Sequence, residues 1–511
     1  MSKLGTVYLV GAGPGDAGLL TLRGAELISR ADVLVYDALV NPDLLTMAPA
    51  SAEVIYAGKR ANAHAIPQEE LNQLLVTKAR QGKTVVRLKG GDPYVFGRGA
   101  EEAEELATAK IPFEIVPGVT SAVAAPAYAG IPITHRDCCS SFTVLTGHER
   151  PDKAESSIDW AQLARDPGTK IILMGVERIG GIMEKLLAHG LASKTPVALV
   201  RWGTTGRQQT IEGTVGDIAE KIQRANFQAP AVTVIGDVVS RRARLNWFEK
   251  RPLFGQRVVV TRTRQQASQL SARLRELGAA ILEIPTIRIT EPNDFNPVKD
   301  AIVGITSYSW LVFTSPNGVD HFAHWFFKAY DDIRSIGACR IAAVGPATAA
   351  RLRALHLQVD LQPEEFTAAA LAKAFKKHGG VENLNVCLFR AQVASAELPQ
   401  SLHELGAIVD EIAVYKTVPE TEDRNGAVAR LQEDGADWIT FASASSVESF
   451  HNRFDLPKAT KEHGWRLLSI GPETTAALTK LKLKPTVEAK PHNIDGMVAA
   501  LLKSAGQSAG R

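Results

Sequence analysis

Short apolar runs alternate with segments of helical spacing through the first half of the chain. The first run, Val7–Val10, is followed by apolar residues at helical spacing from Leu19 to Ile28. A short apolar run is typical of a buried strand, and apolar residues three or four positions apart form one face of a helix. The alternation predicts an α/β fold, with further strands at residues 33–36, 53–56, 84–88, 113–116, 143–146, 170–174, 196–200 and 231–235.

The second half of the chain contains an internal repeat. The run Trp310–Ser315 recurs as Trp438–Ser443, 128 residues later, and a Gly-Pro turn at Gly345 recurs at Gly471, 126 residues later. A repeat of this kind decides the architecture of this half. We therefore expect a pair of doubly wound α/β domains, with a cleft between them that the Ser- and Thr-bearing loops face.

The pattern of both halves breaks near residue 241. A basic run, Arg241–Arg244, is followed there by aromatic residues and by Arg251-Pro252. Charge runs are usually solvated, so we interpret this segment as a linker and not as a binding patch. The expected organisation is a first domain at 1–245, a linker at 246–255, a second part at 256–503 and a disordered polar tail at 504–511.

Composition excludes few classes of protein. The 511 residues are 45% apolar and 22% charged, with a formal net charge of +3, which gives no reason to expect nucleic-acid binding. The four cysteines have no metal-ligand spacing, so we expect reduced thiols, no bound metal and a cytoplasmic location. No apolar run reaches the roughly 18 residues that a membrane span needs, and no signal peptide is evident.

A glycine-rich loop follows the first predicted strand. Gly11, Gly13 and Gly15 allow close backbone approach at the carboxyl end of that strand, where open α/β sheets bind ligands. A dinucleotide site is disfavoured because Asp16 stands where its third glycine is expected and Pro14 removes a backbone donor. The loop therefore favours a neutral or cationic ligand over a phosphate.

Six motifs in the first half occur together in one order. They are Gly11–Asp16, Tyr36–Val40, Gly58-Lys59, Arg87–Pro93 with Phe96–Arg98, Val116–Ser121 and Gly130–Arg136. Together they resemble the tetrapyrrole methylase family, most closely its uroporphyrinogen-III C-methyltransferases, over residues 3–245. The resemblance implies S-adenosyl-L-methionine as the methyl donor and a tetrapyrrole as the acceptor. We also expect a homodimer formed through this domain.

The resemblance implies residue roles for the methylase. The donor is expected at Pro14, Gly90, Gly91, Asp92, Val95, Thr120, Ser121, Met174 and Gly203. The acid/base pair of the family falls on Asp37 and Lys59, and substrate carboxylates are expected at Arg98, His135 and Arg136. The chemistry of the reaction agrees, because methylation of a pyrrole carbon is followed by loss of a proton to a base. Without the family, Asp37 could equally be a helix N-cap and Lys59 an exposed lysine.

The second half resembles the uroporphyrinogen-III synthases from Gly255 to Leu502. The motifs are Val260–Arg262, Phe313–Val319, Val344-Gly345, Val414–Thr417, Phe441–Ser443 and Ile470–Ala476. The resemblance implies two lobes, one formed by 256–290 with 416–503 and the other by 291–415. Ala391 departs from the pattern, because the family has glycine after the residue that matches Arg390. If the loop needs positive φ, alanine there would be strained.

The synthase resemblance also implies residue roles. Tyr415 matches the tyrosine that assists departure of the substrate hydroxyl, the alternative being a core tyrosine with a satisfied hydroxyl. Carboxylate binding is expected at Arg262, Ser315, Ser443, Thr474 and Thr475. We expect a bifunctional enzyme that cyclises hydroxymethylbilane and then methylates the product to precorrin-2. Two alternatives stay open: a methylase of a later corrin precursor, and a second half that only binds a tetrapyrrole.

Overall fold

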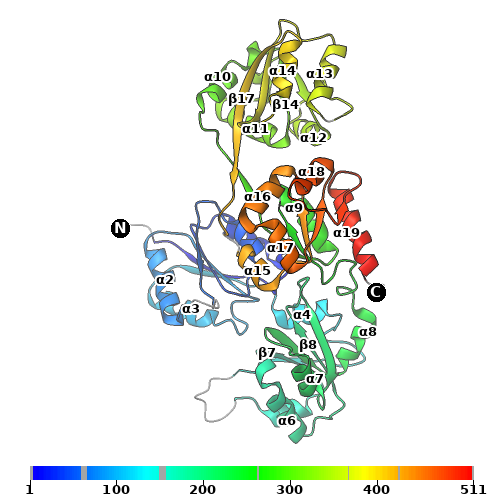
Figure 1. Cartoon of the computed structure of the whole chain (residues 1–511). Helices are drawn as coiled ribbons and strands as arrows, with labels where there is room; N and C mark the ends of the chain where they lie inside the picture. The colour runs from blue at the N-terminus through cyan, green and yellow to red at the C-terminus, as the bar shows by residue number, and fades with distance from the viewer. Residues whose placement is uncertain are drawn as a thin grey trace. The chain divides into compact units, whose positions relative to one another are not determined.

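The computed structural model describes residues 4–58, 66–148, 157–261, 264–365, 367–423 and 426–508. The chain divides into two compact units. Unit 1 combines Met1–Ile284 with Glu422–Arg511, and unit 2 is Pro285–Thr421 (Figure 1). Within these ranges, unit 1 holds three sheets of five strands and unit 2 holds one. None of the helices in the described ranges is long and apolar enough to cross a membrane.

The first sheet of unit 1 is parallel throughout, in the order β3-β2-β4-β1-β5. Its strands are nearly continuous apolar runs because helices cover both faces. One face packs against α2 and α3 and the other against α1 and η2. The elements are β1 (Val7–Gly11), η1 (Ala17–Leu19), α1 (Leu22–Ser29), β2 (Val33–Tyr36), η2 (Pro42–Met47), β3 (Glu53–Tyr56), α2 (Gln68–Arg80), β4 (Val85–Lys89), α3 (Gly99–Thr108), β5 (Phe113–Val116) and α4 (Ser121–Tyr128).

The second sheet has the order β6-β7-β10-β8-β9 and is mixed. Only β6 and β7 pair in parallel, while β10 pairs antiparallel with both β7 and β8, and β8 with β9. The elements are β6 (Phe142–Thr146), α5 (Trp160–Arg165), β7 (Thr169–Leu173), η3 (Val176–Arg178), α6 (Ile179–Ala188), β8 (Pro196–Arg201), β9 (Gln209–Thr214), α7 (Ile218–Arg224), β10 (Ala231–Ile235), η4 (Asp237–Arg241) and α8 (Arg242–Leu245). The predicted strands are all present, and β9 was missed.

The third sheet, which with its helices we call the C-terminal lobe, is parallel in the order β12-β11-β18-β19-β20. The strand at 257–260 pairs on one side with the strand at 280–283 and on the other with a strand that begins at Trp438, so the lobe is discontinuous in sequence. Its elements are β11 (Arg257–Val260), α9 (Arg264–Glu276), β12 (Ala280–Glu283), α15 (Ala427–Asp434), β18 (Trp438–Phe441), α16 (Ala444–Phe454), α17 (Leu456–His463), β19 (Arg466–Ser469), α18 (Pro472–Lys480), β20 (Val487–Glu488) and α19 (Ile494–Ser508).

Unit 2 contains the fourth sheet, in the order β13-β17-β16-β14-β15. The long strand β17 pairs in parallel with β16 and antiparallel with β13, up to Pro419 opposite Ile287. This ladder explains why the unit runs from 285 to 421, beyond the expected 291–415. The elements are β13 (Ile287–Thr290), α10 (Asn296–Val303), η5 (Ile305–Ser307), β14 (Trp310–Phe313), α11 (Pro316–Ala329), η6 (Ile333–Ile336), β15 (Arg340–Ala343), α12 (Pro346–Ala354), α13 (Ala368–Lys377), β16 (Asn385–Ala391), α14 (Glu397–Glu404) and β17 (Ile408–Pro419). The predicted α/β class is confirmed in all four sheets.

Two expectations about loose segments are wrong. The basic run is not solvated throughout, because Arg242 is buried and pairs with Glu212 and Glu249 at 2.8 and 2.6 Å. In the predicted linker, the side chains of Phe248 and Leu253 are buried. The tail is helical through 508, since α19 packs its apolar face onto the core of the C-terminal lobe; residues 509–511 lie outside the described residues.

Candidate active sites

Three loops meet at the carboxyl ends of β4, β1 and β5. The backbones of Gly13 and Gly91 exchange two hydrogen bonds, of 3.2 and 2.7 Å between nitrogen and oxygen. A Cβ atom on Gly11 would lie 2.5 Å from the Cα of Gly118 and 2.7 Å from the carbonyl oxygen of Gly91. Only glycine fits at this approach, because rigid backbone surrounds the position on both sides. The glycine-rich loop therefore packs closely against the loops that follow β4 and β5.

These closely packed loops lead to a prediction for Gly11. A methyl group there would push β4 and β5 away from β1, so Gly11→Ala is expected to destabilise the protein by about 2 kcal/mol or more and to abolish methyl-donor binding. Thermal unfolding and calorimetric titration with S-adenosylhomocysteine measure both effects. The control is Gly180→Ala in α6, where nothing lies within 4 Å of the added Cβ; equal destabilisation by both substitutions would contradict the account.

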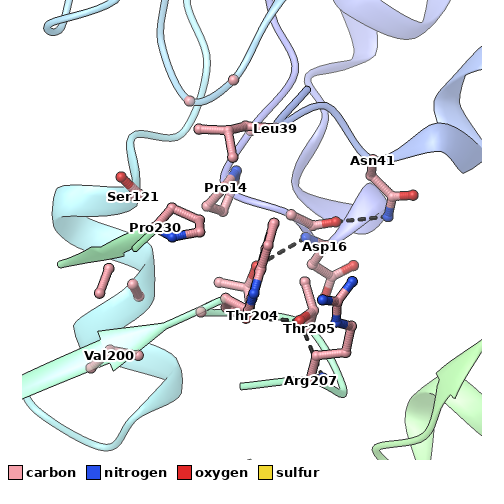
Figure 2. A pocket seen from close by; sticks show the side chains of 18 of the residues that line it. Pro14, Asp16, Leu39, Asn41, Ser121, Val200, Thr204, Thr205, Arg207 and Pro230 are labelled. Carbon is pink, nitrogen blue, oxygen red and sulfur yellow. Dashed lines mark hydrogen bonds between the residues drawn. The ribbon is translucent and has the colours of Figure 1, made fainter. Parts of the chain in front are cut away.

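Asp16 connects the loop to the rest of the first domain (Figure 2). Its carboxylate accepts hydrogen bonds from the Gly18 amide and the Tyr128 hydroxyl, both at 2.8 Å, and its own amide donates to the Thr204 hydroxyl at 2.9 Å. Burial and the neighbouring Asp16 raise the pKa of Tyr128, so the phenol stays protonated and keeps donating. Asp16, which stands where a dinucleotide site would have its third glycine, thus connects the loop that follows β1 to the loop that follows β8.

A cavity of about 580 Å³ lies beside this loop. Its lining includes eight of the nine residues predicted to hold the methyl donor, namely Pro14, Gly90, Gly91, Val95, Thr120, Ser121, Met174 and Gly203. Asp92 is not in the lining. Its carboxylate instead accepts from the amides of Tyr94, Val95 and Gly118, at 2.8, 3.2 and 3.0 Å, and so shapes the loop that carries Val95.

The chemistry of this lining fits S-adenosyl-L-methionine. The eight residues offer backbone groups, two hydroxyls and apolar side chains, but no charged side chain. These eight residues suit an adenosine with a sulfonium cation, which needs no anion-binding side chain; arginines, among them Arg207 and Arg251, also line the cavity. Thr120 caps α4 through the Ala122 amide, which fixes the direction of its hydroxyl. When bound, the donor supplies an electrophilic methyl group.

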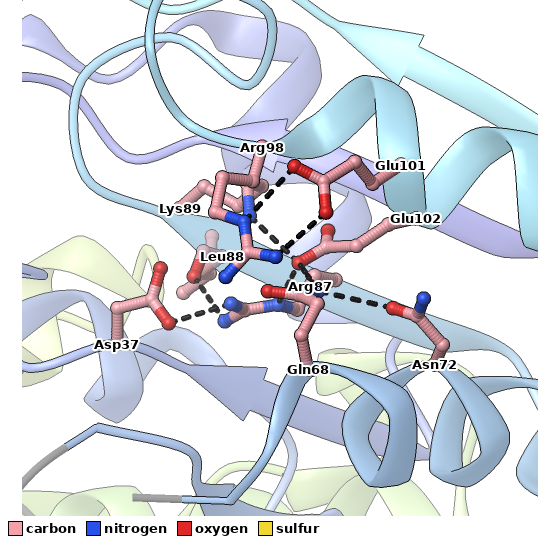
Figure 3. Close-up of polar contacts among 9 residues, drawn as sticks. All are labelled: Asp37, Gln68, Asn72, Arg87, Leu88, Lys89, Arg98, Glu101 and Glu102. Carbon is pink, nitrogen blue, oxygen red and sulfur yellow. Dashed lines mark hydrogen bonds and ion pairs between the residues drawn. The ribbon is translucent and has the colours of Figure 1, made fainter. Parts of the chain in front are cut away.

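Asp37 follows β2 at the same edge of the sheet. Its Oδ1 atom accepts a 2.6 Å hydrogen bond from Nη2 of Arg87, which is buried on β4 (Figure 3). Asp37 is not a helix cap in this structure, since its carboxylate forms an ion pair and remains 31% exposed. Lys59, its predicted partner, lies outside the described residues. Sequence reasoning did not identify Arg87 as a partner of Asp37, because a single arginine within an apolar run is also typical of a strand at the edge of a sheet.

The predicted tetrapyrrole-binding cations of the first domain lie on two loops. Arg98 has a left-handed backbone (φ +60°) before α3 and forms two hydrogen bonds with Glu101, at 3.0 and 2.7 Å. Arg136 is exposed, and Nδ1 of His135 accepts from the Asp137 amide at 3.1 Å. Arg98 and Arg136 are thus accessible to a carboxylated substrate, Arg98 through an exposed ion pair that contributes little stability.

In unit 2, Ser315 and Tyr415 lie close together. Their hydroxyl oxygens are 3.1 Å apart, and Ser315 also caps α11 through the Gly318 amide. A β-bulge in β17 places Ala391 opposite Tyr415 where a regular ladder would place Val414. Ala391 does not have a positive φ, so the departure from glycine brings no strain. Arg390 is occupied by an ion pair with Glu411 at 2.7 Å.

The other predicted synthase residues lie in unit 1. Ser443 caps α16 through a reciprocal capping box with Ser446. Thr474 is buried, so its hydroxyl is not available to a carboxylate. The Thr475 hydroxyl bonds Ser469 and Glu488, which makes it part of a local network. Arg262 lies outside the described residues.

His321 is a residue of unit 2 that sequence reasoning missed. Its ring stacks on Tyr415 with 5.4 Å between centroids and 24° between planes. Burial, and then the neighbouring His324, lower the pKa of His321, against the opposing effect of Asp320 and Glu291. A histidine gives little signal in a sequence because its role depends on what packs against it.

The lowered pKa of His321 predicts a pH dependence of stability. Between the lowered pKa of the folded state and the unfolded pKa of about 6.5, the unfolded chain binds more protons than the folded one at this site. The free energy of unfolding therefore falls as the pH drops through and below about 6.5, and is independent of this group at higher pH. Thermal unfolding midpoints at pH 7.5 and 5.5 measure the loss. His321→Gln is expected to reduce it, and an unchanged loss in this variant would contradict the assignment.

The comparisons with known proteins cover both halves. Residues 6–219 match the family model of the tetrapyrrole (corrin/porphyrin) methylases, and residues 268–499 match that of uroporphyrinogen-III synthase HemD. The porphyrin biosynthesis protein HemD of Ruminiclostridium josui is 39% identical over 98% of both chains. The chain belongs to the tetrapyrrole methylases and, in its second part, to the uroporphyrinogen-III synthases. It is a fusion of both.

Two further matches concern the methylase alone. An S-adenosyl-L-methionine-dependent uroporphyrinogen III methyltransferase of Methanosarcina barkeri is 55% identical over 46% of this chain and 92% of its own. The crystal structure of a Thermus thermophilus uroporphyrin-III C-methyl transferase with S-adenyl homocysteine is 39% identical, with TM-score 0.40, and covers 46% of this chain and 99% of its own. The fusion is a bifunctional enzyme of tetrapyrrole biosynthesis, with methyltransferase and synthase activities and S-adenosyl-L-methionine as methyl donor.

Proposed function

We propose that the enzyme makes precorrin-2 from hydroxymethylbilane in two successive reactions. The synthase part cyclises hydroxymethylbilane to uroporphyrinogen-III, with loss of water and inversion of ring D. The methylase part then methylates uroporphyrinogen-III at C2 and C7. The observation that carries the proposal is the match of one chain, over 98% of its length, to a relative that is named for porphyrin biosynthesis.

In the methylase, Asp37 is the proposed base. Addition of a methyl cation to a pyrrole carbon leaves a positive charge on the macrocycle, which is relieved when a neighbouring carbon loses its proton to a carboxylate. Asp37 suits this role because it lies at the ligand-binding edge of the sheet and is fixed by Arg87 at 2.6 Å. Arg98 and Arg136 are proposed to bind substrate carboxylates, and Lys59 to be the proton donor.

In the synthase, Tyr415 is the proposed group that assists departure of the hydroxyl. Ser315 lies 3.1 Å from its phenol oxygen, so the two hydroxyls form a short chain along which a proton moves toward the leaving oxygen. The substrate hydroxyl takes this proton and leaves as water, and its departure leaves an azafulvene cation, which needs positioning more than it needs a nucleophile. The stacked His321 holds the Tyr415 ring in place.

Two incubations test the scheme, one with hydroxymethylbilane and one with uroporphyrinogen-III as the supplied tetrapyrrole. In each, the purified enzyme receives the tetrapyrrole and S-adenosyl-L-methionine under anaerobic conditions, and the product mass is measured. Two added methyl groups on a cyclised product are expected. A cyclised product without added methyl groups would contradict the methylase half, and conversion of supplied uroporphyrinogen-III without conversion of hydroxymethylbilane would contradict the synthase half.

A homodimer formed through the methylase domain and a cytoplasmic location are further proposals. The four cysteines, at positions 138, 139, 339 and 387, are all free thiols, as is usual in a reducing compartment. Light scattering on the intact enzyme tests the dimer: a mass of twice 55.0 kDa supports it, and a single-chain mass contradicts it.

A further inference from the structure

A buried charge cluster lies behind Asp37 and is formed by Asp37, Arg87, Lys89 and Glu102 (Figure 3). Arg87 and Lys89 project from β4 and are 2% and 3% exposed, while Glu102 in the first turn of α3 is 0% exposed. Charges removed from water in this way are costly unless they are paired. The cluster contains two cations and two carboxylates.

Arg87 is fixed at three points. Its Nη2 atom donates to Asp37 at 2.6 Å, its Nη1 atom to the carbonyl of Leu88 at 3.1 Å, and its Nε atom to Glu102 Oε1 at 3.3 Å. A guanidinium is planar, so contacts at two of its edges determine its orientation. Glu102 on one side therefore determines where Arg87 places the Asp37 carboxylate on the other.

The orientation of Glu102 supports this role. Its Oε1 atom accepts from Lys89 at 2.7 Å, from Arg87 and from Gln68, while its Oε2 atom has no hydrogen-bond partner among the described residues. A buried oxygen without a partner is unfavourable. The carboxylate is thus not arranged to satisfy both of its own oxygens, but to direct one oxygen at both cations.

Lys89 contacts Glu102 but makes no hydrogen bond to Asp37 in the described structure. Burial, and then the nearby Arg87, lower the pKa of Lys89. It lies on the same strand as Arg87, with similar burial and the same acidic partner. Lys89 therefore offers a matched comparison for Arg87, since it has the same surroundings without the contact to the proposed base.

We propose that Glu102 and Arg87 are positioning residues for methylation, which hold the Asp37 carboxylate in the orientation needed to remove the proton. The proposal rests on the proposed role of Asp37 as base. Neither residue is expected to contact the tetrapyrrole or the methyl donor. Their effect is expected on the rate of the chemical step, through the position of one carboxylate oxygen.

The test measures methylation of uroporphyrinogen-III by the full-length enzyme. Glu102→Gln keeps the shape of the side chain but removes its charge, and Arg87→Lys keeps a cation but cannot reach both carboxylates. Each is expected to lower kcat by about 10²-fold, as a small misplacement of a catalytic group does. The KM for uroporphyrinogen-III and the Kd for S-adenosylhomocysteine are expected to change less than about twofold. Lys89→Met is expected to lower kcat by less than about threefold.

The thermodynamic cycle with Asp37→Asn separates positioning from a structural role. If Glu102 acts through Asp37, adding Glu102→Gln to Asp37→Asn lowers kcat little further, because the base is already absent. Losses that multiply would overturn the proposal, as would a kcat for Glu102→Gln close to that of the unmodified enzyme. Binding of S-adenosylhomocysteine by the same chains reports whether the methylase domain of each variant is folded, and Arg87→Lys keeps the test decisive if Glu102→Gln misfolds. Full activity of Asp37→Asn would instead contradict the proposed base, which distinguishes the two failures.

Discussion

Asp37→Ala is expected to lower the rate of methylation of uroporphyrinogen-III by about 10²- to 10⁴-fold, the usual contribution of a positioned general base. The substitution removes the carboxylate that Arg87 holds at 2.6 Å, which is the proposed acceptor of the proton. Cyclisation of hydroxymethylbilane is expected to be unchanged. Transfer of a labelled methyl group and the rate of hydroxymethylbilane consumption are measured on the same preparation.

Asp37→Asn is the matched variant for this prediction. It keeps an acceptor oxygen for Arg87 and so preserves the packing of the buried charge cluster, but an amide does not act as a base. Both variants are expected to be similarly slow. A fast Asp37→Asn beside a slow Asp37→Ala would assign Asp37 a structural role, and loss of cyclisation in either variant would show that the substitution disturbs more than the methylase.

Tyr415→Phe is expected to have the second largest effect, a loss of about 10²-fold in cyclisation with methylation of supplied uroporphyrinogen-III unchanged. The variant keeps the ring that stacks on His321 and that is buried in unit 2. It removes only the hydroxyl that lies 3.1 Å from Ser315. The loss is therefore expected in kcat, with the unfolding midpoint of the protein nearly unchanged.

Tyr330→Phe serves as the control for Tyr415. Tyr330 lies in the same unit, and its hydroxyl also makes hydrogen bonds, to the carbonyls of Ile302 and Val303 at 3.4 and 3.3 Å. Removing that hydroxyl is expected to leave cyclisation within about twofold. Equal losses from both tyrosines would mean that cyclisation responds to the rigidity of unit 2 and not to the Tyr415 hydroxyl.

The strand pattern was predictable because it depends on local sequence. The strands of the first sheet are short apolar runs. The predicted ends of each strand lie within one residue of the observed ends. The strand β9 was missed because it is only partly buried, with polar residues at most of its positions. The order in which strands pair was not predictable, since the antiparallel pairing of β10 depends on contacts between residues far apart in the chain.

The candidate sites likewise contain some features that local sequence predicts and others that depend on residues far apart in the chain. Motifs predicted which loops line the methyl-donor cavity, because each motif is a local glycine-rich turn. They did not predict that Asp92 accepts hydrogen bonds from its own loop and from Gly118, or that Thr474 is buried. The partnership of Arg87 with Glu102 joins a strand to a helix, and nothing local in either segment indicates it. Prediction therefore failed mainly where a polar side chain forms hydrogen bonds with another part of the protein and not with a ligand.

The discontinuity of the C-terminal lobe has a consequence for biosynthesis. The strand β11 pairs with β12 on one side and with β18 on the other, at Val258 opposite Trp438. A ribosome must therefore deliver all of unit 2 before β11 meets its second neighbour. Unit 2 has its own sheet and core, so it is able to fold before β11 pairs with β18. This lobe is then completed last, and its first strands are the part of the nascent chain most exposed to mispairing.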